Sequence, residues 1–484
     1  MRSKSGILLF LLSLLLLTMA QAGIADEADD AMNMPEAPLN ERVLSVPGDS
    51  YSPVSLQVTV YMPNGPGPFP LAIMNHGATS KVPPEQQPRY RITFAAYYFL
   101  SRGYAVALPM MRGYAGSEGR LVTHRCNYAA TGLEAAVDVR AVIEYMKQQP
   151  GIDGSQIVVA GQSFGGWNTL ALGALNVPNV KGLVSFSGAM EMPTCETSYA
   201  SLLEGAQWLG AHTTTPSIWF FGDNDQLFST RTWHGMYDRY TAAGGPAELV
   251  AYGTFQKDSH NMLGSGAGLP IWVPKVDAFL GKVGLPHRLI YPEYMPGAPP
   301  PPSHYANLDD TDALPYLTDP GRVLYQKFLE LPLPRAFVIS PTYGSSYSGG
   351  FDPRAQALKV CRQHGPNCQL YAVDNDVVWV RPTPAPPPTQ FAALADQNAV
   401  PYLTDKGREG YQKFLTLRRP RAFVIAPDGA WYFAAVGVDP LARALSKCGE
   451  LHHDCALYAV DGDVVWAKTV RASDPAHESV GVTR

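Results

Sequence analysis

The sequence predicts an α/β fold with a mostly parallel sheet and helices on both faces, followed by two small α+β repeats. Between residues 53 and 288, short apolar runs alternate with longer segments of helical periodicity. This alternation is typical of parallel strands joined by helical crossovers. A proline-rich linker at 289–307 then leads to two related copies at 308–381 and 394–468.

Composition restricts the partners of this chain. Hydrophobic residues make up 46% and charged residues 16%, which allows a sizeable core, and the formal net charge is −5. A nucleic-acid-binding domain normally needs a basic face. We therefore expect no nucleic-acid partner.

The first 25 residues predict a signal peptide. Two basic residues precede an apolar run at 7–17, and Ala-Gln-Ala at 20–22 offers a cleavage site, with Ala25 as a later alternative. The apolar run is shorter than the roughly 20 residues that span a bilayer. We expect a bacterial periplasmic or secreted protein with no stable membrane anchor after cleavage.

Six cysteines suit an oxidising compartment, where disulfides persist. Two pairs occupy matching places in the copies, Cys361 with Cys368 and Cys448 with Cys455, which leaves Cys126 to pair with Cys195 by elimination. The competing interpretation is a metal site. The spacing is not C-x-x-C and no histidine cluster accompanies it, so disulfides are favoured.

The α/β region divides into seven strands and five helices. The strands are expected at 55–61, 71–75, 105–108, 157–160, 182–186, 218–221 and 248–252. The helices are expected near 91–102, 127–148, 166–175, 230–243 and 271–280. Residues 26–52 are predicted to be irregular, and 190–215 to form a loop that roofs the pocket and is tethered by Cys195.

The central motif is Gly-Gln-Ser-Phe-Gly-Gly at 161–166. It follows an apolar strand and opens a helix, which is the setting of a nucleophile elbow. The glycines allow the sharp turn, and the turn lifts the Ser163 hydroxyl above the sheet at a helix N-terminus. Ser163 is the candidate nucleophile.

A serine nucleophile needs a histidine base, and the base needs an acid that orients it. In this kind of fold the acid follows the serine along the chain, and the histidine follows the acid. Downstream, the predicted strand at 218–221 ends in a Gly-Asp-Asn-Asp sequence that contains Asp225, and Asp223 is the alternative acid. We favour Asp225 because of its G-x-x-D placement.

The candidate base is His260, which follows the last predicted strand and precedes the last helix. Three other histidines are less well placed. His212 precedes the acid, His234 lies inside a predicted helix, and His287 follows the last helix.

The oxyanion hole needs two backbone donors. One is expected from Phe164, directly after the nucleophile. The other is expected from Ala78, with Gly77 as the alternative, in the loop after the strand at 71–75. His76 in this loop is predicted to brace the backbone.

These motifs carry a family resemblance over about half of the chain. They are Asn-His-Gly at 75–77, Arg-Gly-Tyr-Ala-Gly-Ser at 112–117, the Ser163 motif, and the segments around Asp225 and His260. Residues 53–288 resemble the dienelactone-hydrolase and acetyl-xylan-esterase branch of the α/β-hydrolases, and also the prolyl-oligopeptidase catalytic domain. Dienelactone hydrolases proper use a cysteine where this chain has Ser163, and prolyl oligopeptidases carry a propeller that the sequence lacks.

The C-terminal repeat is visible in four motif pairs, offset by 86 residues early and 87 late. The pairs are 314–319 with 400–405, 325–329 with 411–415, 335–339 with 421–425, and 370–374 with 457–461. Each copy is predicted to form helix, strand, helix and hairpin, with Trp379 and Trp466 ending the hairpins. The copies resemble short repeats of other exported bacterial proteins, which implies no activity.

Three functions follow from these patterns. The first is hydrolysis of a small carboxylic ester or acyl substrate through Ser163, His260 and Asp225, without metal or organic cofactor. The second is a peptidase or amidase with the same residues. The third is binding of a cell-envelope partner through the repeats.

Overall fold

The computed structural model describes residues 34–467 except 36, 80–81, 92, 342 and 438. The expected signal peptide at 1–25 lies outside these residues. The chain divides into two compact units at Ala298 and Pro299, with Gly349–Asp352 also assigned to the first unit. Among the described residues, every helix is too short or too polar to cross a lipid bilayer.

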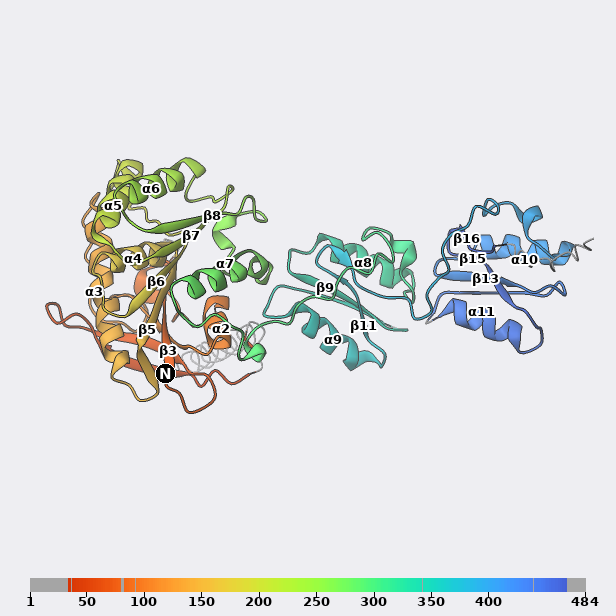
Figure 1. Ribbon diagram of the computed structural model, residues 1–484, viewed down its shortest axis with the longest axis horizontal. Coiled ribbons are helices and arrows are strands. Elements are labelled where there is room, and N and C mark those ends of the chain that lie inside the picture. Colours follow the sequence, from red (N-terminus) through yellow and green to blue (C-terminus); the bar gives the residue numbers. More distant parts are fainter. Residues whose placement is uncertain are drawn as a thin grey trace, which may run out of the picture. The chain divides into compact units, whose positions relative to one another are not determined.

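The first unit is built on an eight-stranded sheet with the order β1-β2-β4-β3-β5-β6-β7-β8. Figure 1 labels β3 and β5 to β8 of this sheet. Strand β2 pairs antiparallel with β1 and β4, and the strands from β4 to β8 pair in parallel. The strands are Arg42–Pro47 (β1), Ser55–Tyr61 (β2), Phe69–Asn75 (β3), Ala105–Pro109 (β4), Ile152–Gln162 (β5), Val180–Phe186 (β6), Ser217–Phe221 (β7) and Ala247–Ala251 (β8). All seven predicted strands are present.

Helices cover both faces of this sheet (Figure 1). They are Phe94–Ser101 (α2), Tyr128–Lys147 (α3), Phe164–Gly173 (α4), Ser198–His212 (α5), Thr230–Ala242 (α6) and Leu269–Lys282 (α7). Ile157 of β5 packs in one core with Trp167 of α4, and its neighbour Val158 packs in the other core with Trp272 of α7. Because successive side chains enter opposite cores, the central strands are apolar throughout.

Two elements correct the sequence prediction. Strand β1 lies in a segment expected to be irregular, and α5 occupies most of the expected 190–215 loop. Strand β1 is an edge strand whose only buried residue is Val46, so no apolar pattern marks it. Helix α5 contains Gly210, whose added Cβ would lie 2.2 Å from the Tyr240 carbonyl oxygen. That glycine permits close packing on α6 but lowers helix propensity.

The second unit contains two four-stranded sheets, ordered β10-β9-β11-β12 and β14-β13-β15-β16. The first copy comprises Asp319–Glu330 (α8), Arg335–Ile339 (β9), Gly344–Ser348 (β10), Pro353–His364 (α9), Gln369–Val373 (β11) and Asp376–Val377 (β12). The second comprises Asp405–Leu415 (α10), Arg421–Ile425 (β13), Trp431–Ala435 (β14), Pro440–Gly449 (α11), Ala456–Val460 (β15) and Asp463–Val464 (β16). Strands β10 and β14 were not predicted; they are edge strands whose sequences, Gly-Ser-Ser-Tyr-Ser and Trp-Tyr-Phe-Ala-Ala, lack alternation of apolar and polar residues.

All three expected disulfides are present. They join Cys126 to Cys195, Cys361 to Cys368 and Cys448 to Cys455. The two short bridges tie α9 to the residue before β11 and α11 to the residue before β15, in small units that gain from a covalent link. The long bridge ties the segment before α3 to the segment before α5.

Breaking a buried ion pair should strongly destabilise the first unit. Arg112 donates from Nε and Nη2 to the two carboxylate oxygens of Asp138, both at 2.7 Å, and both side chains are buried. Arg112→Met leaves the carboxylate without its counter-charge, so we expect a loss of about 3–5 kcal/mol in the free energy of unfolding. Denaturant unfolding measures this loss. The control is Arg140→Met, which removes a more exposed pair with Asp49 and should cost less than about 1 kcal/mol. Equal costs would contradict the prediction.

Candidate active site

Ser163 lies at the sharp turn between β5 and α4, as the sequence predicts. Its backbone has φ 54° and ψ −125°, a conformation that costs a non-glycine residue about 1–3 kcal/mol. The Ser163 N–H donates to the Phe186 carbonyl of β6 at 2.9 Å, and the Ser163 carbonyl accepts from Trp167 N–H at 3.0 Å. The surrounding structure therefore holds this residue in a strained position, which is common at functional sites.

The glycines beside Ser163 are needed because backbone segments meet there. A Cβ on Gly161 would lie 2.2 Å from the Gly165 carbonyl oxygen. A Cβ on Gly165 would lie 2.3 Å from the Asn75 carbonyl oxygen and 2.4 Å from that of His76. The turn and the loop after β3 consequently pack in direct contact.

Gly165→Ala should destabilise the first unit strongly. Both contacts are with backbone oxygens, which cannot rotate away, so we expect a loss of more than about 3 kcal/mol or a failure to fold. Soluble yield and thermal unfolding measure the effect. Gly264→Ala is the matched control, since its nearest atom would lie at 3.7 Å. A Gly165→Ala protein as stable as this control would refute the packing argument.

The structure brings His260 and Asp225 together. His260 Nδ1 lies 2.9 Å from Asp225 Oδ2, and the side chains are 11% and 0% exposed. Asp225 Oδ1 accepts backbone N–H groups of Leu227 and Phe228, both at 2.9 Å. Asp223, the alternative acid, is exposed. Of the two carboxylates, Asp225 is therefore the one that orients the imidazole.

The pKa of Asp225 is lowered overall. Burial alone would raise it, but the hydrogen bond and charge of His260 and the N–H groups of Phe228 and Leu227 favour the carboxylate. The acid thus stays ionised at neutral pH, as an acceptor for the Nδ1 proton of His260.

The backbone of His260 is fixed beside the elbow. Gln162, which precedes Ser163, donates from its side-chain amide to the His260 carbonyl at 2.8 Å. Asp258 accepts the His260 N–H at 3.0 Å. Among the hydrogen bonds of the described residues, none joins the Ser163 hydroxyl to the His260 ring.

The loop after β3 runs directly against the serine. A Cβ on Gly77 would lie 3.3 Å from Ser163 Cβ and 3.9 Å from its Oγ. The adjoining Ala78 is exposed, and Phe164 begins α4, where first-turn N–H groups have no intrahelical partners. The backbone segments predicted to supply the oxyanion donors thus both border the serine.

His76 braces this loop. Its Nδ1 lies 2.6 Å from the Gly77 carbonyl oxygen, and its Nε2 accepts from Met111 N–H at 3.0 Å. Burial lowers the pKa of His76 to about 4, with the Gly77 carbonyl opposing that shift, so the ring is neutral. Because both ring nitrogens are engaged, His76 supports the backbone at Gly77.

The remaining candidate histidines make local contacts. His212 bonds to the Trp208 carbonyl at the end of α5, His234 stacks on Trp233 in α6, and His287 bonds to the Leu285 carbonyl. In the described part of the chain, no group of three His, Cys, Asp or Glu residues is arranged to hold a metal ion.

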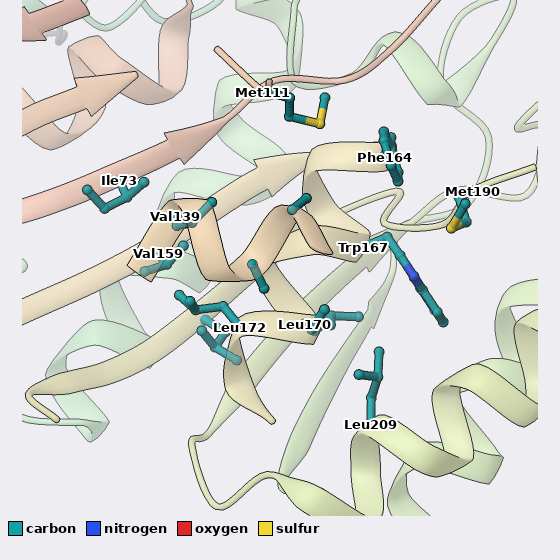
Figure 2. Close-up of a cluster of buried hydrophobic side chains, with 14 of the residues drawn as sticks. Ile73, Met111, Val139, Val159, Phe164, Trp167, Leu170, Leu172, Met190 and Leu209 are labelled. Atoms are coloured by element: carbon teal, nitrogen blue, oxygen red, sulfur yellow. The ribbon is translucent and has the colours of Figure 1, made fainter. Parts of the chain in front are cut away.

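Apolar side chains line the region around the elbow. Figure 2 shows Met111, Phe164, Met190 and Trp167, which belong to one buried cluster. Along the chain, Met190 lies between the end of β6 and Cys195. The Cys126–Cys195 disulfide therefore restrains the segment that carries Met190. The helical part of the predicted roof, α5, packs on α3 and α6.

Three supporting residues were missed by sequence reasoning: Gln162, Asn224 and Asp258. Asn224 donates to the carbonyls of Phe255 and Gln256 and so ties the acid loop to the base loop. The only signal for these residues is adjacency to Ser163, Asp225 and His260. Gln162 and Asn224 bind partners about 30 to 100 residues away, and Asp258 accepts the distant Gln226 N–H at 3.1 Å as well as the nearby His260 N–H. Local patterns do not reveal the distant partners.

Part of the chain matches a known protein family. Residues 49–247, less than half of the chain, match the model of a family described as X-Pro dipeptidyl-peptidase (S15 family). No curated protein sequence matches the chain.

Similar solved structures include esterases and peptidases. An esterase from Pyrococcus furiosus is 17% identical, covers 52% of this chain and 97% of its own, and has a TM-score of 0.38. Dipeptidyl peptidase 4 from Porphyromonas gingivalis is 17% identical over 50% of this chain and 35% of its own, with a TM-score of 0.40. An acylaminoacyl peptidase from Pyrococcus horikoshii is 14% identical over 51% and 42%, with a TM-score of 0.40.

The first unit is an α/β-hydrolase domain, as its strand order and helical layers show. The strand–Ser163–helix turn and the match of residues 49–247 to a peptidase family model are both typical of serine hydrolases and peptidases. The expected dienelactone-hydrolase branch stays a prediction.

Proposed function

We propose that this protein hydrolyses a carboxylic ester through Ser163, His260 and Asp225. The observation that supports it is the His260 Nδ1–Asp225 Oδ2 contact of 2.9 Å on loops fastened to the strained Ser163 turn. In this setting the His260 imidazole, oriented by Asp225, is the base that the serine hydroxyl needs in order to attack.

In the proposed reaction, Ser163 Oγ attacks the acyl carbon and its proton passes to His260 Nε2. The N–H groups of Phe164 and Ala78 stabilise the oxyanion, and the imidazolium then protonates the leaving alcohol. Water next gives a proton to His260 and attacks the acyl-enzyme, which releases the acid and restores Ser163. Asp225 holds the imidazole orientation throughout.

A peptidase or amidase is the second candidate, favoured by the match to a peptidase family. The same residues would act, with an amine as the leaving group. Rates on p-nitrophenyl acetate and on X-Pro and other peptide anilides separate the two candidates. A kcat/KM higher for an anilide than for the ester would favour the peptidase.

A fluorophosphonate probe tests the shared mechanism, since it labels an activated serine without knowledge of the substrate. We expect one labelled peptide, which contains Ser163, and no labelling of Ser163→Ala. Labelling at another serine, or none in a folded protein, would refute the assignment.

Export to the periplasm or medium is a further part of this proposal. The apolar N-terminal sequence and the three disulfides support it. Binding of an envelope partner by the repeats is a separate proposal, because it does not require chemistry at Ser163.

A further inference from the structure

The two repeats carry the same aromatic and acidic surface. Tyr305, just before the first copy, meets Trp379 edge-on at 4.6 Å and 75°, and Phe391, just before the second copy, meets Trp466 at 4.5 Å and 75°. We define the acceptor face of the first copy as Tyr305, Asp310, Pro315, Tyr316, Asp319 and Trp379. The sequence offsets assign Phe391, Asp396, Pro401, Tyr402, Asp405 and Trp466 to the acceptor face of the second copy.

The acceptor face of the first copy is covered by the second copy, chiefly by two arginines. Arg419 donates to both carboxylate oxygens of Asp310, at 3.0 and 2.8 Å. Arg418 pairs with Asp319. The Gly437 N–H also donates to a carbonyl oxygen on this face, that of Pro315, at 2.9 Å. Within this unit the face therefore receives an arginine-bearing segment.

A third arginine, at the end of the first copy, completes this contact. Arg381 lies over the Tyr305 ring, with its guanidinium carbon 5.2 Å from the ring centre, and pairs with Asp461 of the second copy. Cations over aromatic rings and ion pairs both favour arginine at such a surface.

The acceptor face of the second copy has the same chemical groups, but its aromatic side chains are more exposed. Tyr402 is 50% and Phe391 is 38% exposed, whereas their counterparts are half-buried. Trp379 is buried at 3% exposure, and Trp466 is half-buried. Among the described residues, Asp396 has no ion-pair partner, and Asp405 pairs with Arg408 of its own helix.

A second molecule of this chain lacks the matching donor. In the second copy, Arg418 and Arg419 supply the contact, and in the first copy these positions are Pro332 and Leu333. The first copy of another molecule would thus bring no arginines to the acidic groups of the second. This difference argues against a head-to-tail chain of identical molecules.

We propose that the acceptor face of the second copy is a docking site for an arginine-bearing segment of another protein. The two aspartates bind guanidinium groups, and Phe391 and Tyr402 stack against the segment. The site lies in a different unit from Ser163 and does not depend on the proposed hydrolase function.

A labelled peptide tests this site on the full chain. The probe carries the sequence of residues 415–422, Leu-Thr-Leu-Arg-Arg-Pro-Arg-Ala, and its fluorescence anisotropy reports binding at low salt. We expect saturable binding that weakens about tenfold when Asp396→Asn and Asp405→Asn are combined. The same loss is expected when glutamine replaces the first two arginines of the peptide.

The matched control combines Glu409→Gln with Asp454→Asn, which removes the same charge from exposed positions outside the acceptor face. This control protein should bind the peptide like the wild type. No saturable binding up to about 1 mM, or equal losses in both double variants, would overturn the proposal.

Three further outcomes would also overturn it. Concentration-dependent self-association in sedimentation velocity that requires Asp396 and Asp405 would identify a second molecule of this chain as the occupant. Binding that appears only after truncation at Ala467 would identify the chain's own remaining residues. Binding of a neutral oligosaccharide that needs Tyr402 but neither aspartate would identify a carbohydrate site.

Discussion

Ser163→Ala should abolish hydrolysis while the protein stays folded. Loss of the nucleophile in serine hydrolases lowers kcat by about 10⁴- to 10⁶-fold, and the residual rate comes from binding and the oxyanion donors. Alanine retains the Cβ, so the backbone strain at φ 54° stays the same and the free energy of unfolding should change little. Initial rates on p-nitrophenyl acetate and thermal unfolding measure the two effects.

Ser155→Ala is the control for this variant, because Ser155 is exposed in the first half of β5 and its hydroxyl donates to the nearby Asp153 carboxylate. Its rate should stay within about twofold of the wild type. Activity of Ser163→Ala above a hundredth of the wild-type rate would show that the hydrolysis takes place elsewhere.

The sequence predicted best those strands, turns and disulfides that depend on residues close together in the chain. The apolar run at 157–160 followed by Gly-Gln-Ser-Phe-Gly predicts a strand and a sharp turn, and β5, Ser163 and α4 have that arrangement. Ile157 and Val158 of this strand enter opposite cores, with Trp167 and Trp272 respectively, because successive strand residues point to opposite faces of the sheet. The matched cysteine spacings likewise predict the two short disulfides.

Long-range contacts were harder to predict. Order along the chain favours Asp225 over Asp223, but only the structure shows that Asp225 is buried against His260 and that Asp223 is exposed. Helix α5 was missed because glycines such as Gly210, which permit its close approach to α6, also weaken its helical signal. The contact between the repeats depends on Arg418 and Arg419, whose acidic partners lie about 100 residues earlier.

Asp225→Asn should reduce kcat by about 10⁴-fold, because an amide no longer holds the imidazole in the tautomer that accepts the serine proton. The control Asp223→Asn should lose less than about tenfold, since that exposed side chain does not contact His260. Rates on p-nitrophenyl acetate at neutral pH compare the two variants. Similar losses in both, or a larger loss in Asp223→Asn, would reassign the acid.

Stability against pH provides an independent test of the same carboxylate. The pKa of Asp225 is lower in the folded protein than its ordinary value, so its charge stabilises the fold fully above the unfolded pKa of about 4. This contribution is lost as the pH falls through the lowered folded value, because the native carboxylate then binds the proton that the unfolded chain already holds. Thermal unfolding from pH 7 to pH 3 should therefore show wild-type stability falling toward that of Asp225→Asn only below about pH 4. The stability difference between the wild type and Asp225→Asn could instead stay constant from pH 7 to pH 3. That result would show that His260 and the backbone N–H groups do not stabilise the ionised form of Asp225.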